Sequence, residues 1–122
     1  MKTVYIISTG TELMLGHTAD TNALFLSREL TALGLRVVGR SAVGDNREMI
    51  KLAFRTGLEV ADLVVCTGGM GPTADDLSRE VVAEVLGEPL IPNEAEFEKI
   101  KDYFARRQRT MPDSNRKQAL FP

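Results

Sequence analysis

The sequence contains a single cysteine and a single histidine among its 122 residues. One cysteine cannot form a disulfide within the chain, and neither residue type is numerous enough for a multi-cysteine or poly-histidine metal site. No run of about 18 apolar residues occurs, so we expect no membrane-spanning helix. The first residues also lack the long apolar stretch and the cleavage site of a secretory signal peptide. We therefore expect a cytoplasmic protein that does not contact membranes.

The sequence also has little net charge, but its charges are unevenly distributed. The formal net charge of −2 gives no general attraction for nucleic acid, so we expect no direct nucleic-acid binding. Residues 1–98 carry 8 basic and 15 acidic side chains, whereas residues 99–117 carry 7 basic and 2 acidic ones. This basic segment is interpreted as a solvated helix face, as a patch that faces phosphate, or as a contact for an acidic partner.

Hydrophobic residues make up 43% of the chain and charged residues 26%, which is typical of one globular domain. Short apolar runs at residues 3–8, 35–43 and 62–66 predict three strands. Segments with helical periodicity separate and follow them. This alternation predicts a parallel α/β fold with right-handed crossovers and helices on both faces of the sheet. Three strands form a small sheet for this class, so we expect residues 1–122 to be one domain that is incomplete at its C-terminal end.

Apolar residues at helical spacing predict four helices. Their buried stripes are expected at Ala23, Leu26, Leu30 and Leu33; at Ile50, Phe54 and Leu58; at Leu77, Val81 and Val85; and at Phe97, Ile100 and Phe104. Capping pairs three residues apart mark the starts of the last three helices. These pairs are Asp45 with Glu48, Thr73 with Asp76, and Asn93 with Glu96. A short helix is expected from Asp113.

Three loops follow the carboxyl ends of the predicted strands, at residues 8–13, 43–46 and 67–73. Ligands of open α/β sheets bind beyond these ends of the strands. The loops are rich in small and polar residues, and each lies beside acidic side chains. The acids are Glu12, Asp45, and the adjacent pair Asp75 and Asp76. We therefore expect the functional site at this edge of the sheet.

The third loop contains Gly68, Gly69 and Gly71 between Thr67 and Thr73. Glycines permit positive φ and leave backbone N–H groups uncovered, and consecutive uncovered N–H groups before a helix bind anions. The two threonine hydroxyls can donate further hydrogen bonds, which suits a phosphate or a diphosphate. The loop is neither a Walker A motif nor a G-x-G-x-x-G motif. The alternative is a tight strand-to-helix turn that needs glycine for geometry alone.

Carboxylates beside an anion site repel a bare phosphate, and a divalent cation removes this conflict. Mg²⁺ typically uses one or two carboxylates together with the phosphates of the substrate. Asp75 and Asp76, with Asp45 and Glu12 from the neighbouring loops, could form such a site. The alternatives are helix capping for Asp75, Asp76 and Asp45, and a turn contact for Glu12.

Two further segments carry polar residues that could contact the same ligand. Asn22 is predicted in the first turn of a helix, where it either caps that helix or contacts a ligand in the neighbouring loop. Asn115, Arg116 and Lys117 are predicted at a helix start, a place suited to phosphate recognition within the chain or across a subunit interface. No side chain is an obvious nucleophile, so direct attack by water is the simplest hydrolytic mechanism.

The motifs in these loops resemble those of the CinA family of competence/damage-inducible proteins. The resemblance rests on Gly10-Thr11-Glu12-Leu13, with Gly16 and Thr21-Asn22, and on Val43-Gly44-Asp45-Asn46. It rests most strongly on the run from Thr67-Gly68-Gly69 through Gly71-Pro72-Thr73 to Asp75-Asp76-Leu77. Asn115-Arg116-Lys117-Gln118-Ala119 with Pro122 completes it. More broadly, the chain is similar to the molybdopterin-binding domain of molybdenum-cofactor biosynthesis proteins.

The resemblance implies a three-layer α/β/α sandwich around a mostly parallel sheet. It also implies metal-dependent hydrolysis of the diphosphate of ADP-ribose, with Mg²⁺, Mn²⁺ or Co²⁺ as the cofactor. Asp45 and Asp76 would be catalytic, and together with Asp75 they would bind the metal. The expected substrate contacts are Gly10, Thr11, Glu12, Asn22, Thr67, Gly68, Gly69, Gly71, Thr73, Arg116 and Lys117.

Two other functions are consistent with the same residues. The first is a binding module for molybdopterin or an adenylated pterin, which would use the glycine-rich loop without hydrolysis. The second is a non-enzymatic interaction role in competence or DNA repair, in which the basic residues 99–117 dock a partner. We also expect a homo-oligomer. In the CinA family a separate C-terminal deamidase domain follows on a longer chain, and this sequence does not contain it.

Overall fold

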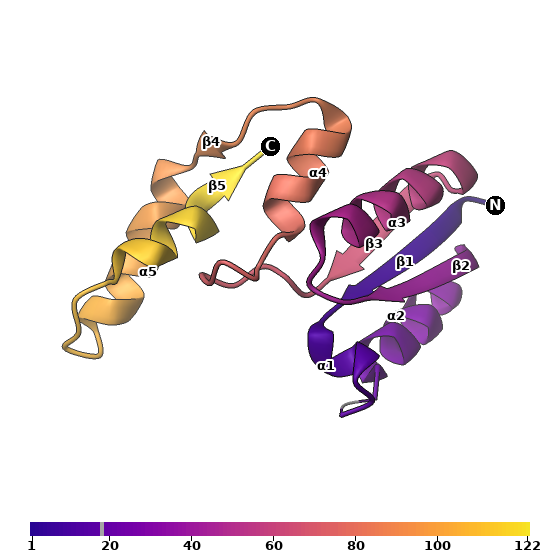
Figure 1. Ribbon diagram of the computed structural model, residues 1–122, viewed down its shortest axis with the longest axis horizontal. Coiled ribbons are helices and arrows are strands. Elements are labelled where there is room, and N and C mark those ends of the chain that lie inside the picture. The colour runs from indigo at the N-terminus through magenta and orange to yellow at the C-terminus, as the bar shows by residue number, and fades with distance from the viewer. Residues whose placement is uncertain (18) are drawn as a thin grey trace.

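The computed structural model describes residues 1–17 and 19–122, and its centre is a three-stranded parallel sheet (Figure 1). The strand order is β2-β1-β3, with β1 at Thr3–Thr9, β2 at Arg36–Val43 and β3 at Leu63–Thr67. Both neighbours run parallel to β1. Val4 to Thr9 are all buried, as expected of a central strand covered on both faces. The predicted parallel α/β class is therefore confirmed.

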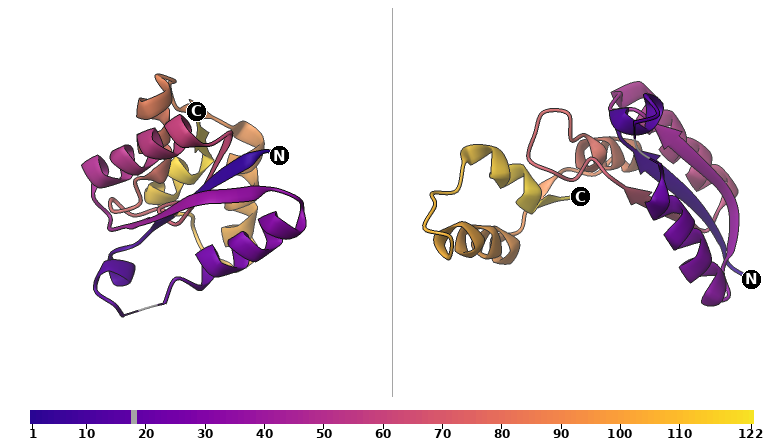
Figure 2. Two further views of the ribbon diagram at one scale, coloured as in Figure 1. Left: turned by 90° about the vertical axis from the view of Figure 1, so that its right-hand side faces the viewer. Right: turned by 90° about the horizontal axis from the view of Figure 1, so that it is seen from below.

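Helices cover both faces of this sheet. Side chains alternate along β1, so apolar residues lie on each face and are buried there by helices. Val4 and Ile6 point to one face and pack with Ala23 of helix α2 (Thr21–Ala32). Tyr5 and Ile7 point to the other face, in a cluster with residues of α3 (Arg47–Val60) and α4 (Ser78–Leu86). Figure 2 shows α2 and α3 on opposite sides of the strands. The three-layer α/β/α arrangement is thus confirmed.

Two predicted capping pairs are wrong about where their helices begin. Asn46, not Asp45, caps α3, because its side chain accepts a hydrogen bond from Met49 N at 3.0 Å. Helix α4 begins at Ser78 without a side-chain cap, so Thr73 and Asp76 form a turn in the preceding loop instead.

Of the helices in the described residues, none is long and apolar enough to cross a membrane.

Two of the predicted stripe residues are exposed. Leu33 follows the end of α2 and is 76% exposed, and Leu58 is 47% exposed. In α3 the buried residue of the last turns is Gly57, whose lack of a side chain lets the helix approach the ring of Tyr5. The buried face of α3 therefore includes Gly57 and not Leu58. Hydrophobic periodicity does not indicate this, because glycine has no apolar side chain.

The last part of the chain lies outside the three layers of the sandwich, and we call it the C-terminal lobe (residues 91–121). It contains β4 (Ile91–Pro92), α5 (Glu94–Ala105), the 3-10 helix η1 (Asp113–Ala119) and β5 (Leu120–Phe121). Asn93 caps α5 as predicted, and β4 pairs antiparallel with β5 across the intervening α5 and η1, which the sequence did not predict. The lobe projects from the sandwich beyond α4 (Figures 1 and 2).

The predicted apolar stripe of α5 is less buried than expected. No residue of α5 is fully buried, and Phe97, Ile100 and Phe104 are only half-buried. The reason is that α5 packs on η1 rather than on the central sheet.

Candidate functional site

The three loops predicted to carry the site leave the same edge of the sheet. Thr9 pairs with Val43 and Ser8 pairs with Thr67, so the carboxyl ends of the three strands are level. Gly10 N donates to Val43 O at 2.9 Å, and Thr9 Oγ1 donates to Thr67 O at 3.1 Å. The parallel register therefore brings together loops that are far apart in sequence.

The glycine loop (residues 67–73) requires glycine at two successive positions. Gly68 has φ of 86°, and a Cβ there would lie 2.3 Å from the backbone oxygen of Thr9. Gly69 has φ of 67°, and a Cβ there would lie 2.3 Å from Ser78 Oγ. Ser78 Oγ donates to Gly68 O at 2.7 Å and Ser78 N donates to Gly69 O at 3.1 Å. Ser78, the first residue of α4, therefore holds the carbonyl groups of both glycines by hydrogen bonds.

The amides of this loop are less well satisfied than its carbonyls. Thr73 N donates to Asp76 Oδ2 at 2.9 Å, and the Gly71 amide helps to lower the pKa of the same carboxyl group. Within residues 1–17 and 19–122, the amides of Gly68, Gly69 and Met70 have no hydrogen-bond acceptor. Three consecutive donors therefore remain available at the carboxyl end of β3. The N-terminus of α4, whose dipole favours an anion, reaches this loop where Ser78 N donates to Gly69 O.

The carboxylate of Asp76 closes the end of the glycine loop. Its Oδ2 accepts from Thr73 Oγ1 at 2.6 Å as well as from Thr73 N. The Thr73 hydroxyl contributes most to lowering the pKa of Asp76, with further contributions from the amides of Thr73 and Gly71 and from the charge of Lys117. Asp76 is therefore ionised at neutral pH, with one oxygen already occupied.

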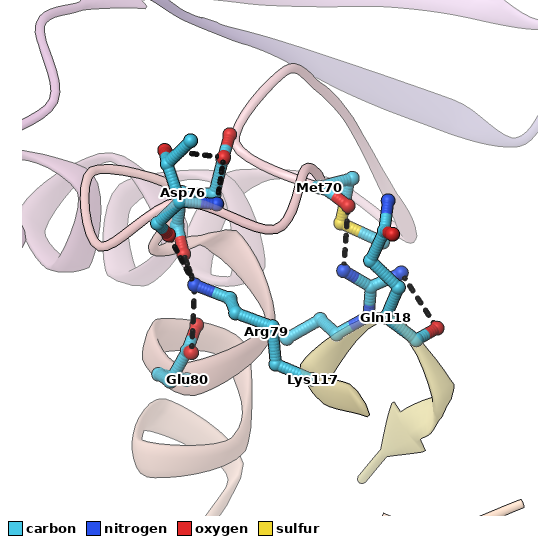
Figure 3. A network of polar contacts seen from close by, with 7 residues as sticks. Met70, Asp76, Arg79, Glu80, Lys117 and Gln118 are labelled. Atoms are coloured by element: carbon cyan, nitrogen blue, oxygen red, sulfur yellow. Dashed lines mark hydrogen bonds and ion pairs between the residues drawn. The ribbon is translucent and has the colours of Figure 1, made fainter. Parts of the chain in front are cut away.

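Lys117 joins the C-terminal lobe to the same loop (Figure 3). Its Nζ donates to Thr73 O at 2.6 Å and to Asp76 O at 2.5 Å, and it lies 3.3 Å from Glu80 Oε1. All three partners lie outside the lobe, and the lysine side chain is only 19% exposed. Lys117, which the sequence analysis predicted to contact phosphate, therefore supports the loop by bonding to its backbone carbonyl groups.

Arg79, which the sequence analysis did not single out, makes a second connection of this kind. Its guanidinium donates to Met70 O at 2.8 Å and to Gln118 O at 3.2 Å, and the residue is 8% exposed (Figure 3). Its Nε has no partner within the described residues. A buried guanidinium held by carbonyl oxygens places positive charge next to the glycine loop, which favours an anion at the loop.

The first two loops contribute a threonine–carboxylate pair. Thr11 Oγ1 donates to Asp45 Oδ2 at 2.9 Å, and Thr11 N donates to the same oxygen at 3.2 Å. The carboxylate of Glu12 folds back over Gly10, where an added Cβ would lie 2.4 Å from Glu12 Oε1. The structure thus brings Gly10, Thr11, Glu12 and Asp45 together beside the strand ends.

Three predicted site residues make no hydrogen bond or ion pair with the glycine loop within the described residues. Asn22 is exposed on α2, where Asp20 rather than Asn22 caps the helix by accepting from Ala23 N. Asp75 is exposed in the turn before α4. Arg116 is exposed on η1 and lies 3.6 Å from Asp113. A ligand would have to reach these side chains for them to take part.

The acidic residues are not assembled into a complete metal cage. Within residues 1–17 and 19–122, no group of three or more His, Cys, Asp and Glu side chains is placed to hold a metal ion. Asp45 and Asp76 each have one oxygen engaged by a threonine. Each carboxylate keeps one further oxygen, and a divalent cation bound there would take its remaining ligands from phosphate oxygens, a common arrangement for Mg²⁺.

The site residues that sequence reasoning missed are mainly supporting ones, namely Thr9, Ser78, Arg79 and Glu80. Each acts through backbone carbonyls or through another side chain, and such contacts leave no local pattern. Arg79 had one usable signal. An arginine in the first turn of a helix opposes the helix dipole, which indicates a role other than stabilising that helix.

Comparison with known proteins identifies the group to which this arrangement belongs. Residues 5–121 match the family described as "Probable molybdopterin binding domain". A CinA-like protein of Syntrophomonas wolfei is 54% identical over 122 residues, which are all of this chain and 29% of that protein. The chain therefore spans less than a third of the length of this curated relative.

Solved structures show the same fold. A protein CinA of unknown function from Thermoplasma acidophilum superposes with a TM-score of 0.91 at 36% identity, covering 99% of this chain and 71% of the other. The molybdopterin biosynthesis enzyme MoaB of Thermus thermophilus superposes with a TM-score of 0.69 at 22% identity, covering 98% and 73%. The second similarity concerns the fold alone.

Proposed function

Because this chain belongs to the family of molybdopterin-binding-type domains and is similar along its whole length to CinA-like proteins, we propose that it binds a nucleotide diphosphate and hydrolyses it. The proposed substrate is ADP-ribose. Water attacks one phosphorus atom, the bridging P–O bond breaks, and AMP and ribose 5-phosphate leave.

One observation carries this proposal: the three consecutive amides of Gly68, Gly69 and Met70, which have no acceptor within the described residues. Exposed amides at a strand-to-helix junction bind phosphate oxygens. The charge of Arg79 lies at Met70 O, and α4 begins at Ser78, whose amide donates to Gly69 O, so the helix dipole acts on the same loop. These groups would hold the diphosphate in place while water attacks it.

The carboxylates at the rim of the loops have two roles in this proposal. Asp45, Asp75 and Asp76 would hold a divalent cation that arrives with the diphosphate, and Asp45 and Asp76 would also orient the attacking water. The cation, Mg²⁺, Mn²⁺ or Co²⁺, would supply Lewis-acid charge neutralisation of the phosphates. Thr11 and Thr73 fix the two carboxylates of Asp45 and Asp76 by hydrogen bonds.

The activity can be tested directly on this 122-residue chain. Incubation with ADP-ribose and Mg²⁺, Mn²⁺ or Co²⁺ should release AMP, detected by ion-exchange chromatography, and EDTA should stop the release. Asp45→Asn should lower the rate by at least tenfold. Glu88→Gln, an exposed change remote from the loops, is the matched control. Absence of AMP with all three metals, while pyrophosphate still binds, would reject hydrolysis but not binding.

A second candidate function is binding of molybdopterin or an adenylated pterin without hydrolysis. The description of the matching family favours it, and so does the incomplete set of metal ligands. The same amides would hold the pterin phosphate. Calorimetric titration with ADP-ribose and with a phosphorylated pterin separates the two candidates, since the physiological ligand should bind at least tenfold more tightly.

A further inference from the structure

A cavity of the described structure lies beside the glycine loop, between α5, η1 and the loop's own Pro72. Its volume is about 540 Å³, within the usual range of small-molecule sites of about 300–1,000 Å³. Its lining includes Pro72, Tyr103, Phe104, Asn115 and Gln118. None of the glycine-loop amides belongs to this lining, so the cavity is a neighbour of the proposed phosphate site.

The apolar wall of the cavity is aromatic and accessible. Tyr103 and Phe104 meet edge to face with ring centroids 5.4 Å apart, and Tyr103 is 53% exposed. The guanidinium of Arg107 lies 3.7 Å from the centroid of the Tyr103 ring. Pro72 belongs to the same lining, on the glycine loop. Rings of this kind form a surface on which a planar aromatic group stacks.

The polar wall of the cavity is an amide pair. Asn115 Nδ2 donates to Gln118 Oε1 at 2.7 Å. This bond leaves the side-chain carbonyl of Asn115 as an acceptor and the amino group of Gln118 as a donor. A donor and an acceptor side by side match the edge of a nitrogen heterocycle, which offers an exocyclic amine next to a ring nitrogen or carbonyl.

The cavity and the phosphate site are held in fixed proximity by one side chain. The guanidinium of Arg79 donates both to Met70 O in the glycine loop and to Gln118 O behind the amide pair. Lys117, which precedes Gln118, is bonded to Thr73 O. A single ligand with a phosphate at one end and a planar ring at the other could therefore contact both.

We propose that this cavity is the recognition site for the planar nitrogen heterocycle of the ligand, with the ring stacked on Tyr103 and its edge bonded to Asn115 and Gln118. The inference rests on the proposed function, because it assigns the other end of the ligand to the glycine loop. A purine and a pterin share this chemistry, and the test below distinguishes them.

The test is calorimetric titration of the chain with inorganic pyrophosphate, ADP, adenosine and free pterin. ADP should bind at least tenfold more tightly than pyrophosphate. Tyr103→Ala should lower ADP affinity about tenfold relative to any change in pyrophosphate affinity, since stacking on an aromatic side chain contributes about 1–3 kcal/mol per base. Gln118→Leu should lower it by a similar factor, because the amino group that donates to the ring edge is lost. Asp102→Asn, on α5 but outside this cavity, is the matched control. Circular dichroism confirms that each variant is folded.

The outcomes separate this proposal from the one before it. If ADP binds no more tightly than pyrophosphate and pterin does not bind, or if both variants keep the wild-type preference, the cavity does not recognise a heterocycle. If pyrophosphate fails to bind but adenosine or pterin binds in a Tyr103-dependent way, the phosphate site is wrong and the cavity stands. Tighter binding of pterin than of adenosine assigns the cavity to a pterin, and the reverse assigns it to a purine.

Discussion

Replacement of Gly68 by alanine tests whether the shape of the glycine loop creates the anion site. The change has two costs. An L-residue with φ of 86° costs about 1–2 kcal/mol, and the new Cβ would lie 2.3 Å from the backbone oxygen of Thr9. Relieving such an overlap costs about 1–3 kcal/mol more, because the strand end cannot move freely. The expected loss in the free energy of unfolding is therefore about 2–5 kcal/mol.

Gly87→Ala is the matched control for this experiment. Gly87 ends α4 with φ of 68°, and a Cβ there would meet nothing within 4 Å. It carries the conformational cost without the overlap, so the expected loss is about 1–2 kcal/mol. Urea unfolding followed by circular dichroism measures both variants.

Binding provides the decisive comparison between the two variants. Gly68→Ala should lower pyrophosphate affinity by at least tenfold, because the loop must shift to admit the methyl group and its amides then lose their common direction. Gly87→Ala should leave pyrophosphate affinity within twofold of the wild type. Wild-type affinity in a folded Gly68→Ala variant would refute the assignment of the anion site to these amides.

Two further predictions concern the groups around the loop. Asp76 has a lowered pKa in the folded chain, so its contribution to stability is present above its unfolded pKa near 3.8 and is lost as the pH falls through the lower folded value. The difference in unfolding free energy between wild type and Asp76→Asn should therefore shrink below pH 4 in urea titrations, and a difference that stays constant down to pH 2 would contradict this. Lys117→Met should cost about 1–3 kcal/mol, because it removes two charged hydrogen bonds to loop carbonyls. The exposed Arg116→Met should cost less than about 0.5 kcal/mol, and equal losses in thermal unfolding would show that Lys117 has no supporting role.

The parallel arrangement of the three strands and the gathering of their loops at one edge of the sheet followed from local sequence patterns. Continuous Val and Ile runs indicate buried parallel strands, and helical periodicity between them requires crossovers. The carboxyl ends of such strands meet at one edge, so the sequence predicts that the loops containing Gly10, Asp45 and Gly68 lie together, and the register of the strands confirms it. These inferences succeed because each depends on residues close together in the chain.

The sequence by itself thus determined the parallel α/β class, the edge of the sheet at which the loops gather, and the loop whose glycines are required. Only the tertiary structure decided that Arg79 and Lys117 hold that loop from behind, that α5 packs on η1, and that a cavity opens beside Pro72. The physical reason is the range of the interactions. Periodicity and backbone conformation are local, whereas a guanidinium that donates to the carbonyls of Met70 and Gln118 joins residues 48 positions apart.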